Sequence, residues 1–122
     1  MDIDFIKWLV SYADGFEIII DNDGDVQIVY SLNKTWFIGF PDITDWVLYP
    51  PLLQRAIEGI NRGNEYEVSL FSGRLFVTNY IKTSGTPFTL SKYETIDQAK
   101  EEALKYIWQE QENDSERRVK TL

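Results

Sequence analysis

Two turn sequences constrain this chain most, because each one joins two β-rich runs and therefore predicts an antiparallel hairpin. The turn sequences are Asn22-Asp23-Gly24-Asp25 and Ser72-Gly73. The runs that they join cover residues 16–21 and 26–31 in the first case, and residues 66–71 and 74–81 in the second. Glycine adopts the left-handed backbone that tight hairpin turns require. A further run over residues 35–40 and a short one over 88–90 predict additional strands.

Apolar side chains recur every three or four residues in three other segments, which predicts amphipathic helices. The predicted helices cover residues 4–13, residues 52–62 and a C-terminal segment that begins after Thr95. Asp2 or Asp4 is a suitable N-cap for the first helix, and Thr95 with Gln98 forms a capping box for the last one. On the last helix we expect Glu110 and the other charged residues to face solvent.

The resulting element order, α-β-β-β-α-β-β-α, predicts the α+β class. Hairpin-linked strands favour a two-layer domain, with one antiparallel sheet of five or six strands and three helices mainly on one face. The length of 122 residues is close to the commonest size of a single domain. We therefore predict one α+β domain over residues 1–112 and a polar, disordered tail over residues 113–122.

The chain contains neither histidine nor cysteine. This composition excludes thiolate nucleophiles, histidine general bases and thiolate or imidazole metal sites. The acidic first turn resembles part of a calcium loop. However, with Gly24 at the invariant glycine position, Ile19 and Tyr30 occupy the first and last ligand positions. We therefore predict a turn with solvated carboxylates, no catalytic residues, no metal and no cofactor.

The net charge of −8 is concentrated near the N-terminus, where residues 1–45 hold nine acids and two bases. This charge argues against direct binding to nucleic acid, whose backbone is recognised by clustered lysine and arginine. Asp2 and Asp4 stand where a signal peptide would carry bases, and no apolar run approaches the length of a membrane span. We expect a cytoplasmic protein that does not contact the membrane.

Five aromatic residues lie among acids between residues 36 and 49. Most of them should enter the core, but an exposed aromatic ringed by acids is typical of a protein-binding surface. For Trp46 and Tyr49 the sequence favours burial, with an exposed contact as the alternative. The candidate partner-binding residues are Asp21, Asp23, Asp25, Asp42, Asp45, Trp46 and Tyr49.

Two segments carry a resemblance to a known group of proteins. Residues 45–61 (DWVLYPPLLQRAIEGIN) and residues 93–107 (YETIDQAKEEALKYI) resemble small uncharacterised accessory proteins encoded by bacteriophages and prophages. The resemblance implies a phage protein made in the cytoplasm of a bacterial host. Because these motifs are structural, it assigns no functional residues.

These observations favour a non-catalytic protein-binding accessory protein, such as a phage-encoded inhibitor of a host protein. An acidic and aromatic surface would suit a basic partner, including a protein that handles nucleic acid. The alternative is a small-ligand or nucleotide-binding domain in which Trp36, Trp46 or Tyr49 stacks on a ring and Arg55, Arg62 or Arg74 holds an anion. A hydrolase that uses the aspartates with Mg²⁺ is a third hypothesis. Homodimerisation through the first helix or an open sheet edge is compatible with each.

Overall fold

The chain divides into two compact units, Met1–Gly59 and Ile60–Leu122. The structure is a computed structural model that describes residues 2–41 and 46–120, apart from the side chains of residues 115–120. The α+β class and the three helices are confirmed, and the six strands are antiparallel. The prediction of one sheet is wrong, because each hairpin pairs with only one further strand and two three-stranded sheets result.

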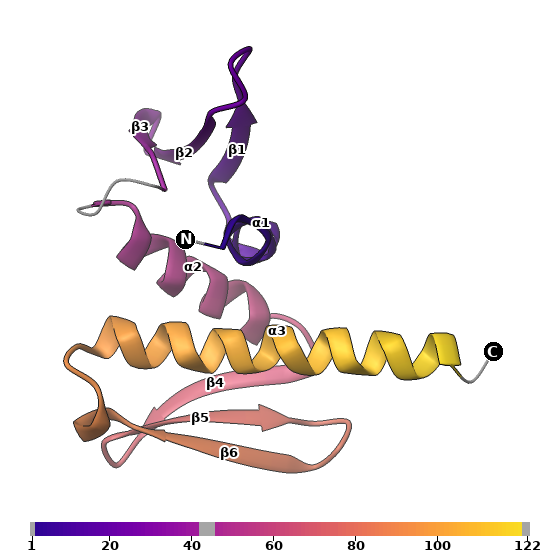
Figure 1. Ribbon diagram of the computed structural model, residues 1–122. Helices are drawn as coiled ribbons and strands as arrows, with labels where there is room; N and C mark the ends of the chain where they lie inside the picture. The colour runs from indigo at the N-terminus through magenta and orange to yellow at the C-terminus, as the bar shows by residue number, and fades with distance from the viewer. Residues whose placement is uncertain (1, 42–45, 121–122) are drawn as a thin grey trace. The chain divides into compact units, whose positions relative to one another are not determined.

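The N-terminal unit contains two helices and the first sheet (Figure 1). Its elements are α1 (Ile3–Tyr12), β1 (Phe16–Ile20), β2 (Val26–Leu32), β3 (Thr35–Gly39) and most of α2 (Tyr49–Asn61). Both neighbours of β2 run antiparallel to it, in the order β1-β2-β3. The predicted first turn is confirmed, with Gly24 in the left-handed region at φ 84°.

Helix α1 is capped as the sequence predicted. The Asp2 carboxylate accepts hydrogen bonds from the backbone N–H of Asp4 at 2.9 Å and of Phe5 at 3.3 Å. These bonds satisfy donors that the first turn of a helix leaves without partners. The helix buries Phe5, Ile6 and Leu9, which supply the apolar stripe facing the core.

One face of the N-terminal sheet is buried. Phe16 and Tyr30, which are directly paired, stack with ring centroids 4.4 Å apart, and Ile28 is fully buried beside them. At Gly39, paired with Ile28, a Cβ atom would overlap the Nε1 atom of Trp46. The absence of a side chain at Gly39 therefore lets the indole of Trp46 cover this end of the sheet.

Helix α2 begins at Tyr49, earlier than the predicted start at residue 52. Pro50 and Pro51 occupy its first turn, where proline costs no hydrogen bond because those N–H groups have no helical acceptor. Its predicted apolar stripe is buried: Leu53, Ala56, Ile57 and Ile60.

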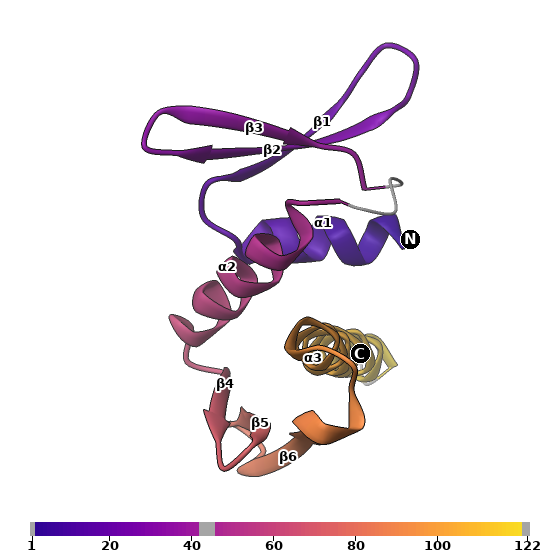
Figure 2. The same ribbon diagram turned by 90° about the vertical axis from the view of Figure 1, so that its left-hand side faces the viewer.

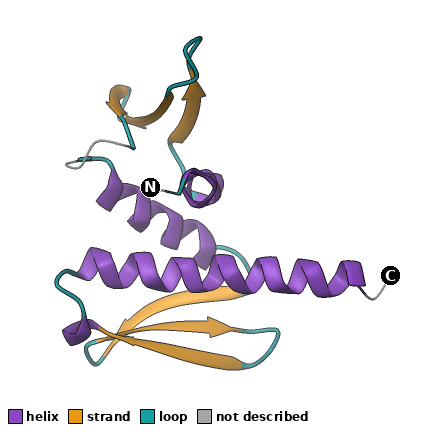
Figure 3. Cartoon of the chain, viewed as in Figure 1, coloured by secondary structure: helices purple, strands orange, loops and turns teal. Residues whose placement is uncertain are grey.

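The C-terminal unit consists of a three-stranded sheet and one long helix (Figure 3). Its elements are β4 (Tyr66–Phe71), β5 (Arg74–Asn79), β6 (Ser84–Thr89), a short 3₁₀ helix η1 (Leu90–Lys92) and α3 (Ile96–Lys120). The predicted second hairpin is confirmed, whereas the last strand begins four residues before the predicted residue 88. Helix α3 contacts β5 and β6. The buried side chains of this unit are Tyr66, Val68, Leu75, Val77, Asn79, Ala99, Ala103, Leu104 and Ile107, together with Ile60 from α2.

The start of α3 follows its capping signal, whereas its end does not follow the prediction. The Thr95 hydroxyl oxygen accepts from the Gln98 N–H at 3.2 Å, and the Gln98 side chain accepts from the Glu94 N–H at 2.9 Å. The helix then continues to Lys120, past the predicted end at residue 112. Residues 113–120 contain no glycine or proline to stop it.

At Gly59, α2 approaches the backbone at the end of α1 closely. A Cβ atom there would overlap the carbonyl oxygen of Tyr12, a backbone atom that no side-chain rotation can move. We expect Gly59→Ala to destabilise the fold by roughly 1–3 kcal/mol, although alanine favours a helix over glycine by about 1 kcal/mol. Chemical denaturation of the variant measures the change.

Gly85→Ala is the matched control, because a Cβ atom at Gly85 meets no atom within 4 Å. It should leave the free energy of unfolding unchanged or slightly higher. Equal stability of the Gly59→Ala variant and the wild type would show that the two helices do not meet at this point.

Candidate functional site

The pairing of the three N-terminal strands gathers apolar side chains on one face of their sheet. Val29 of β2 lies between Glu17 of β1 and Ile38 of β3. Trp36 is paired with Ser31, and Ile19 with Gln27. Directly paired residues point to the same side of a sheet. We call this side the open face, and it comprises Glu17, Ile19, Gln27, Val29, Ser31, Trp36 and Ile38.

Three large apolar side chains on the open face are exposed, whereas Val29, which lies on the same face, is buried. Trp36 is 62% exposed and Ile38 is 58% exposed, and Ile19 is exposed as well. In a sheet with one buried face, the other face normally carries polar side chains. A contiguous apolar patch in that position is typical of a protein-interaction surface.

The outer edge of the same sheet also has a distinct character, which follows from the hydrogen-bond alternation of antiparallel strands. The Ser31 N–H donates to the Gly15 carbonyl at 3.0 Å, and the Asp21 N–H donates to the Asp25 carbonyl at 3.0 Å. Odd-numbered residues of β2 therefore bond to β1, and even-numbered residues bond to Thr35, Phe37 and Gly39 of β3. The N–H and C=O groups of Trp36 and Ile38 consequently point away from the sheet. We call these groups the β3 edge; Figure 2 shows the strand β3, which is an outer strand of this sheet.

Both outer edges of the C-terminal sheet are obstructed. On β4, the outward backbone groups of Val68 are occupied by the Asn61 side chain, which accepts from the N–H at 2.7 Å and donates to the carbonyl at 3.0 Å. On β6, Pro87 stands at an outward position and lacks an N–H. Natural proteins use such devices to prevent another strand from pairing with an edge.

Among the described residues, the β3 edge has neither a proline nor a side chain bonded to its outward backbone groups. The strand Thr35–Gly39 contains no charged residue and no proline. Within residues 2–41 and 46–120, no hydrogen bond engages the outward backbone groups of Trp36 and Ile38. An uncharged apolar edge beside an exposed apolar face is therefore the strongest candidate interaction site in the described part of the chain.

The predicted acidic residues of the first hairpin form a rigid turn, which we call the acidic turn (residues 21–25). One carboxylate oxygen of Asp21 accepts from the backbone N–H groups of Asp23 at 2.9 Å and Asp25 at 2.8 Å. Carboxylate oxygens of these three aspartates lie within 4.8 Å of one another. Because exposed acidic turns are common without an ion, we assign this cluster an electrostatic role only.

The contacts of Trp46 and Tyr49 place these two predicted partner-binding residues outside the open face. Trp46 is only 7% exposed and packs against Gly39, so burial was the correct alternative for its ring. Tyr49 is half-buried and stacks on Trp46 with ring centroids 5.3 Å apart. Asp42 and Asp45 lie outside the described residues. The exposed aromatic on the open face is Trp36, which the sequence analysis had named only for a small-ligand site.

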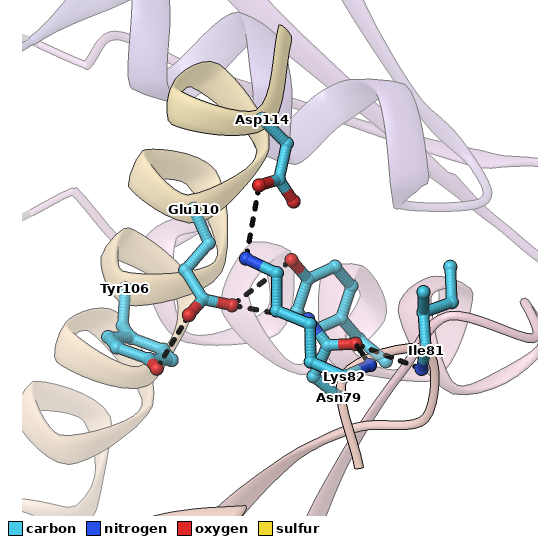
Figure 4. Close-up of polar contacts among 7 residues, drawn as sticks. Asn79, Ile81, Lys82, Tyr106, Glu110 and Asp114 are labelled. Carbon is cyan, nitrogen blue, oxygen red and sulfur yellow. Dashed lines mark hydrogen bonds and ion pairs between the residues drawn. The ribbon is translucent and has the colours of Figure 1, made fainter. Parts of the chain in front are cut away.

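A second polar cluster, in the C-terminal unit, was not anticipated from the sequence (Figure 4). Glu110 of α3 accepts hydrogen bonds from the Tyr106 hydroxyl at 2.8 Å, the Tyr66 hydroxyl at 3.2 Å and the Asn79 amide at 3.4 Å. The expected solvated position of Glu110 is therefore wrong. Three donors already occupy this carboxylate, so it acts as a clamp between α3 and the sheet.

The clamp also perturbs its tyrosines. Burial raises the pKa of Tyr66 well above its ordinary value of 10, and the nearby negative charge of Glu110 raises it further. Asn79 accepts at its side-chain oxygen from the N–H groups of Ile81 and Lys82, both at 3.0 Å. Lys82 in turn pairs with Asp114 at 3.0 Å. Because the groups of this cluster bond to one another, we assign it a structural role.

Comparison of the chain with protein-family models, curated proteins and solved structures gave no match. Among the described residues, no helix has both the length and the apolar character needed to cross a membrane.

The perturbed Tyr66 predicts how stability responds to alkali. In the unfolded chain Tyr66 ionises near pH 10, whereas in the folded chain it stays neutral to a higher pH. Its contribution to stability is thus complete below about pH 10 and is lost as the pH rises towards the folded pKa. Absorbance titration at the tyrosinate band, comparing wild type with Tyr66→Phe, should show a component that ionises above the ordinary tyrosine range.

Glu110→Gln removes the negative charge while keeping the shape of the side chain. We expect the pKa of Tyr66 to move down, without returning fully to its ordinary value because burial remains. Loss of charge-assisted hydrogen bonds should also lower the free energy of unfolding by about 1–3 kcal/mol. An unchanged Tyr66 titration in this variant would contradict the clamp.

Proposed function

We propose that this chain is a non-catalytic protein-binding accessory protein, and that its contact surface is the open face together with the acidic turn. The observation that carries the proposal is the exposure of Trp36 and Ile38 on a regular, well-paired strand. Tryptophan is strongly enriched among the residues that dominate protein-binding energy. On the open face, Trp36 presents its ring without the cost of unfolding any element.

The charge of the N-terminal unit indicates the class of partner. Residues Met1–Gly59 contain ten acids and three bases, a net charge of −7, which is almost the whole charge of the chain. Complementary charge accelerates association and selects among partners. The partner is therefore a basic protein, and proteins that bind nucleic acid form an abundant class of this kind. Carboxylates on this unit would occupy sites that otherwise receive phosphates.

The biological setting of the proposal comes from the resemblance of residues 45–61 and 93–107 to phage accessory proteins. In that setting the chain is made in the cytoplasm of a bacterial host and inhibits a host protein by covering its basic surface. Inhibition of this kind needs no catalytic group on the inhibitor, in keeping with a chain that lacks histidine and cysteine.

The side-chain contacts favour a protein partner over the alternative of a small ligand or nucleotide. Arg55, a candidate for holding an anion, already donates to Glu58 at 3.2 Å and to the Tyr30 hydroxyl at 3.3 Å. Trp46, a candidate for stacking on a base, is buried. Trp36 lies on an open sheet surface, a geometry that suits a flat protein contact.

Trp36→Ser should weaken partner binding strongly with little effect on stability, because the side chain is exposed. Loss of a dominant aromatic contact weakens binding by about 2 kcal/mol or more, which is roughly 30-fold. Capture from a bacterial lysate at low salt, followed by mass spectrometry and measurement of affinity for the purified partner, gives the readout. The retained protein should be basic, and its affinity should fall as salt is added.

Phe71→Ser is the matched control, because Phe71 is a similarly exposed aromatic (69%) that belongs to the C-terminal unit and is not part of the open face. It should bind the partner as the wild type does. Retention of the same partner by Trp36→Ser, in a sample whose circular dichroism shows it to be folded, would rule out the open face as the contact surface.

A further inference from the structure

We propose that the β3 edge receives an extended basic segment of the partner protein as a fourth strand of the N-terminal sheet. This inference depends on the proposed function and specifies the form of the contact. The proposed function concerns the side chains of the open face, and this inference adds hydrogen bonds from the backbone of β3. Strand addition to an exposed sheet edge is a recurring mode of peptide recognition.

The backbone groups of the β3 edge have the spacing that strand addition requires. Trp36 and Ile38 are two residues apart, and each presents one N–H and one C=O outwards. A partner strand would pair with both residues through the alternating pattern of an antiparallel ladder, in which directly opposed residues exchange both hydrogen bonds. The chain obstructs both edges of its C-terminal sheet, with Asn61 on β4 and Pro87 on β6. The absence of such a device on β3 distinguishes this edge from the two edges of the C-terminal sheet.

The side chains beside the edge indicate what the added strand must carry. Residues of the partner that pair with Trp36 and Ile38 would point to the open face, because directly opposed residues share a face. Aromatic–β-branched pairs across neighbouring strands are favourable. The partner segment therefore has apolar, preferably β-branched, residues at two positions two residues apart.

Charge decides between a partner protein and a second copy of this chain. A second copy would bring another N-terminal unit with the same net charge of −7 to the edge. The β1–β2 hairpin, which carries the acidic turn, extends past the end of β3, because Gly39 pairs with Ile28 and Val26 lies beyond it. An added strand would lie two strand spacings from β2, about 10 Å. That distance slightly exceeds the Debye length of about 8 Å at physiological salt, so the attraction of basic residues in the segment should be strongest at low salt.

Three synthetic peptides test the inference on the intact chain. The probe is Lys-Lys-Val-Thr-Val-Thr-Lys-Lys, the second is the same peptide with both valine amides N-methylated, and the third has glutamate in place of each lysine. We expect the probe to slow amide hydrogen exchange at Trp36 and Ile38 in NMR spectra. N-methylation removes the two donors facing β3 and should weaken binding about tenfold or more. The glutamate peptide should not bind.

A substitution in β3 tests the same hydrogen bonds, because it removes a donor of this chain instead of a donor of the peptide. Ile38→Pro removes an outward N–H and leaves the bonds between β2 and β3 in place, because proline is tolerated where an edge N–H faces solvent. We expect at least a severalfold loss of affinity for the probe, whereas Ile38→Val, which keeps the N–H, should bind as the wild type does. If Ile38→Pro does not fold, the N-methylated peptide gives the same information.

The outcomes separate this inference from the proposed function. Equal binding of the free and N-methylated peptides, with binding still lost in Trp36→Ser, would overturn strand addition and leave the open face as a binding surface. Failure of the probe to bind, or equal binding of the glutamate peptide, would overturn the inference as well. Dimers of the chain alone in sedimentation, with Trp36 and Ile38 amides protected, would assign the edge to a second copy.

Discussion

The register of β2 between β1 and β3 decides what the N-terminal unit presents to other molecules. It directs Phe16, Ile28 and Tyr30 into the core and leaves Trp36 and Ile38 on the open face. The same register aims the spare hydrogen-bonding groups of β3 outwards. A slip of one residue would exchange the two faces and would bury the edge groups instead. The register of β2 therefore determines both which side chains the candidate site exposes and which backbone groups of β3 point outwards.

The edge strands of the two sheets differ in whether they can pair with a further strand, although both sheets have three antiparallel strands. In the C-terminal unit, Asn61 and Pro87 prevent further pairing, and the Glu110 clamp holds α3 across the buried face. In the N-terminal unit, the edge strand is apolar and uncharged. The C-terminal sheet shows that residues of this chain can block a sheet edge. The absence of such residues on β3 therefore supports an interaction role for the β3 edge.

Local sequence patterns predicted the hairpins, the helix caps and the apolar stripes, because each depends on residues close together in the chain. Gly24 and Gly73 have the positive φ angles that their turns require, and Asp2 caps α1. The division into two sheets was not predictable in this way, because strand grouping depends on contacts between distant segments. Trp46 is buried because Gly39 makes room for it, and Glu110 turns inwards because Tyr66 and Asn79 lie opposite. Neither cause is visible within one element.

Amide hydrogen exchange of the free chain, resolved residue by residue by NMR, tests the central claim most directly. Along β3, the amides of Phe37 and Gly39 should exchange slowly because they donate to β2, and those of Trp36 and Ile38 should exchange quickly. The Val68 amide, held by Asn61, should be slow although it also points away from its sheet. Protection of Trp36 and Ile38 equal to that of Phe37 would contradict an open β3 edge.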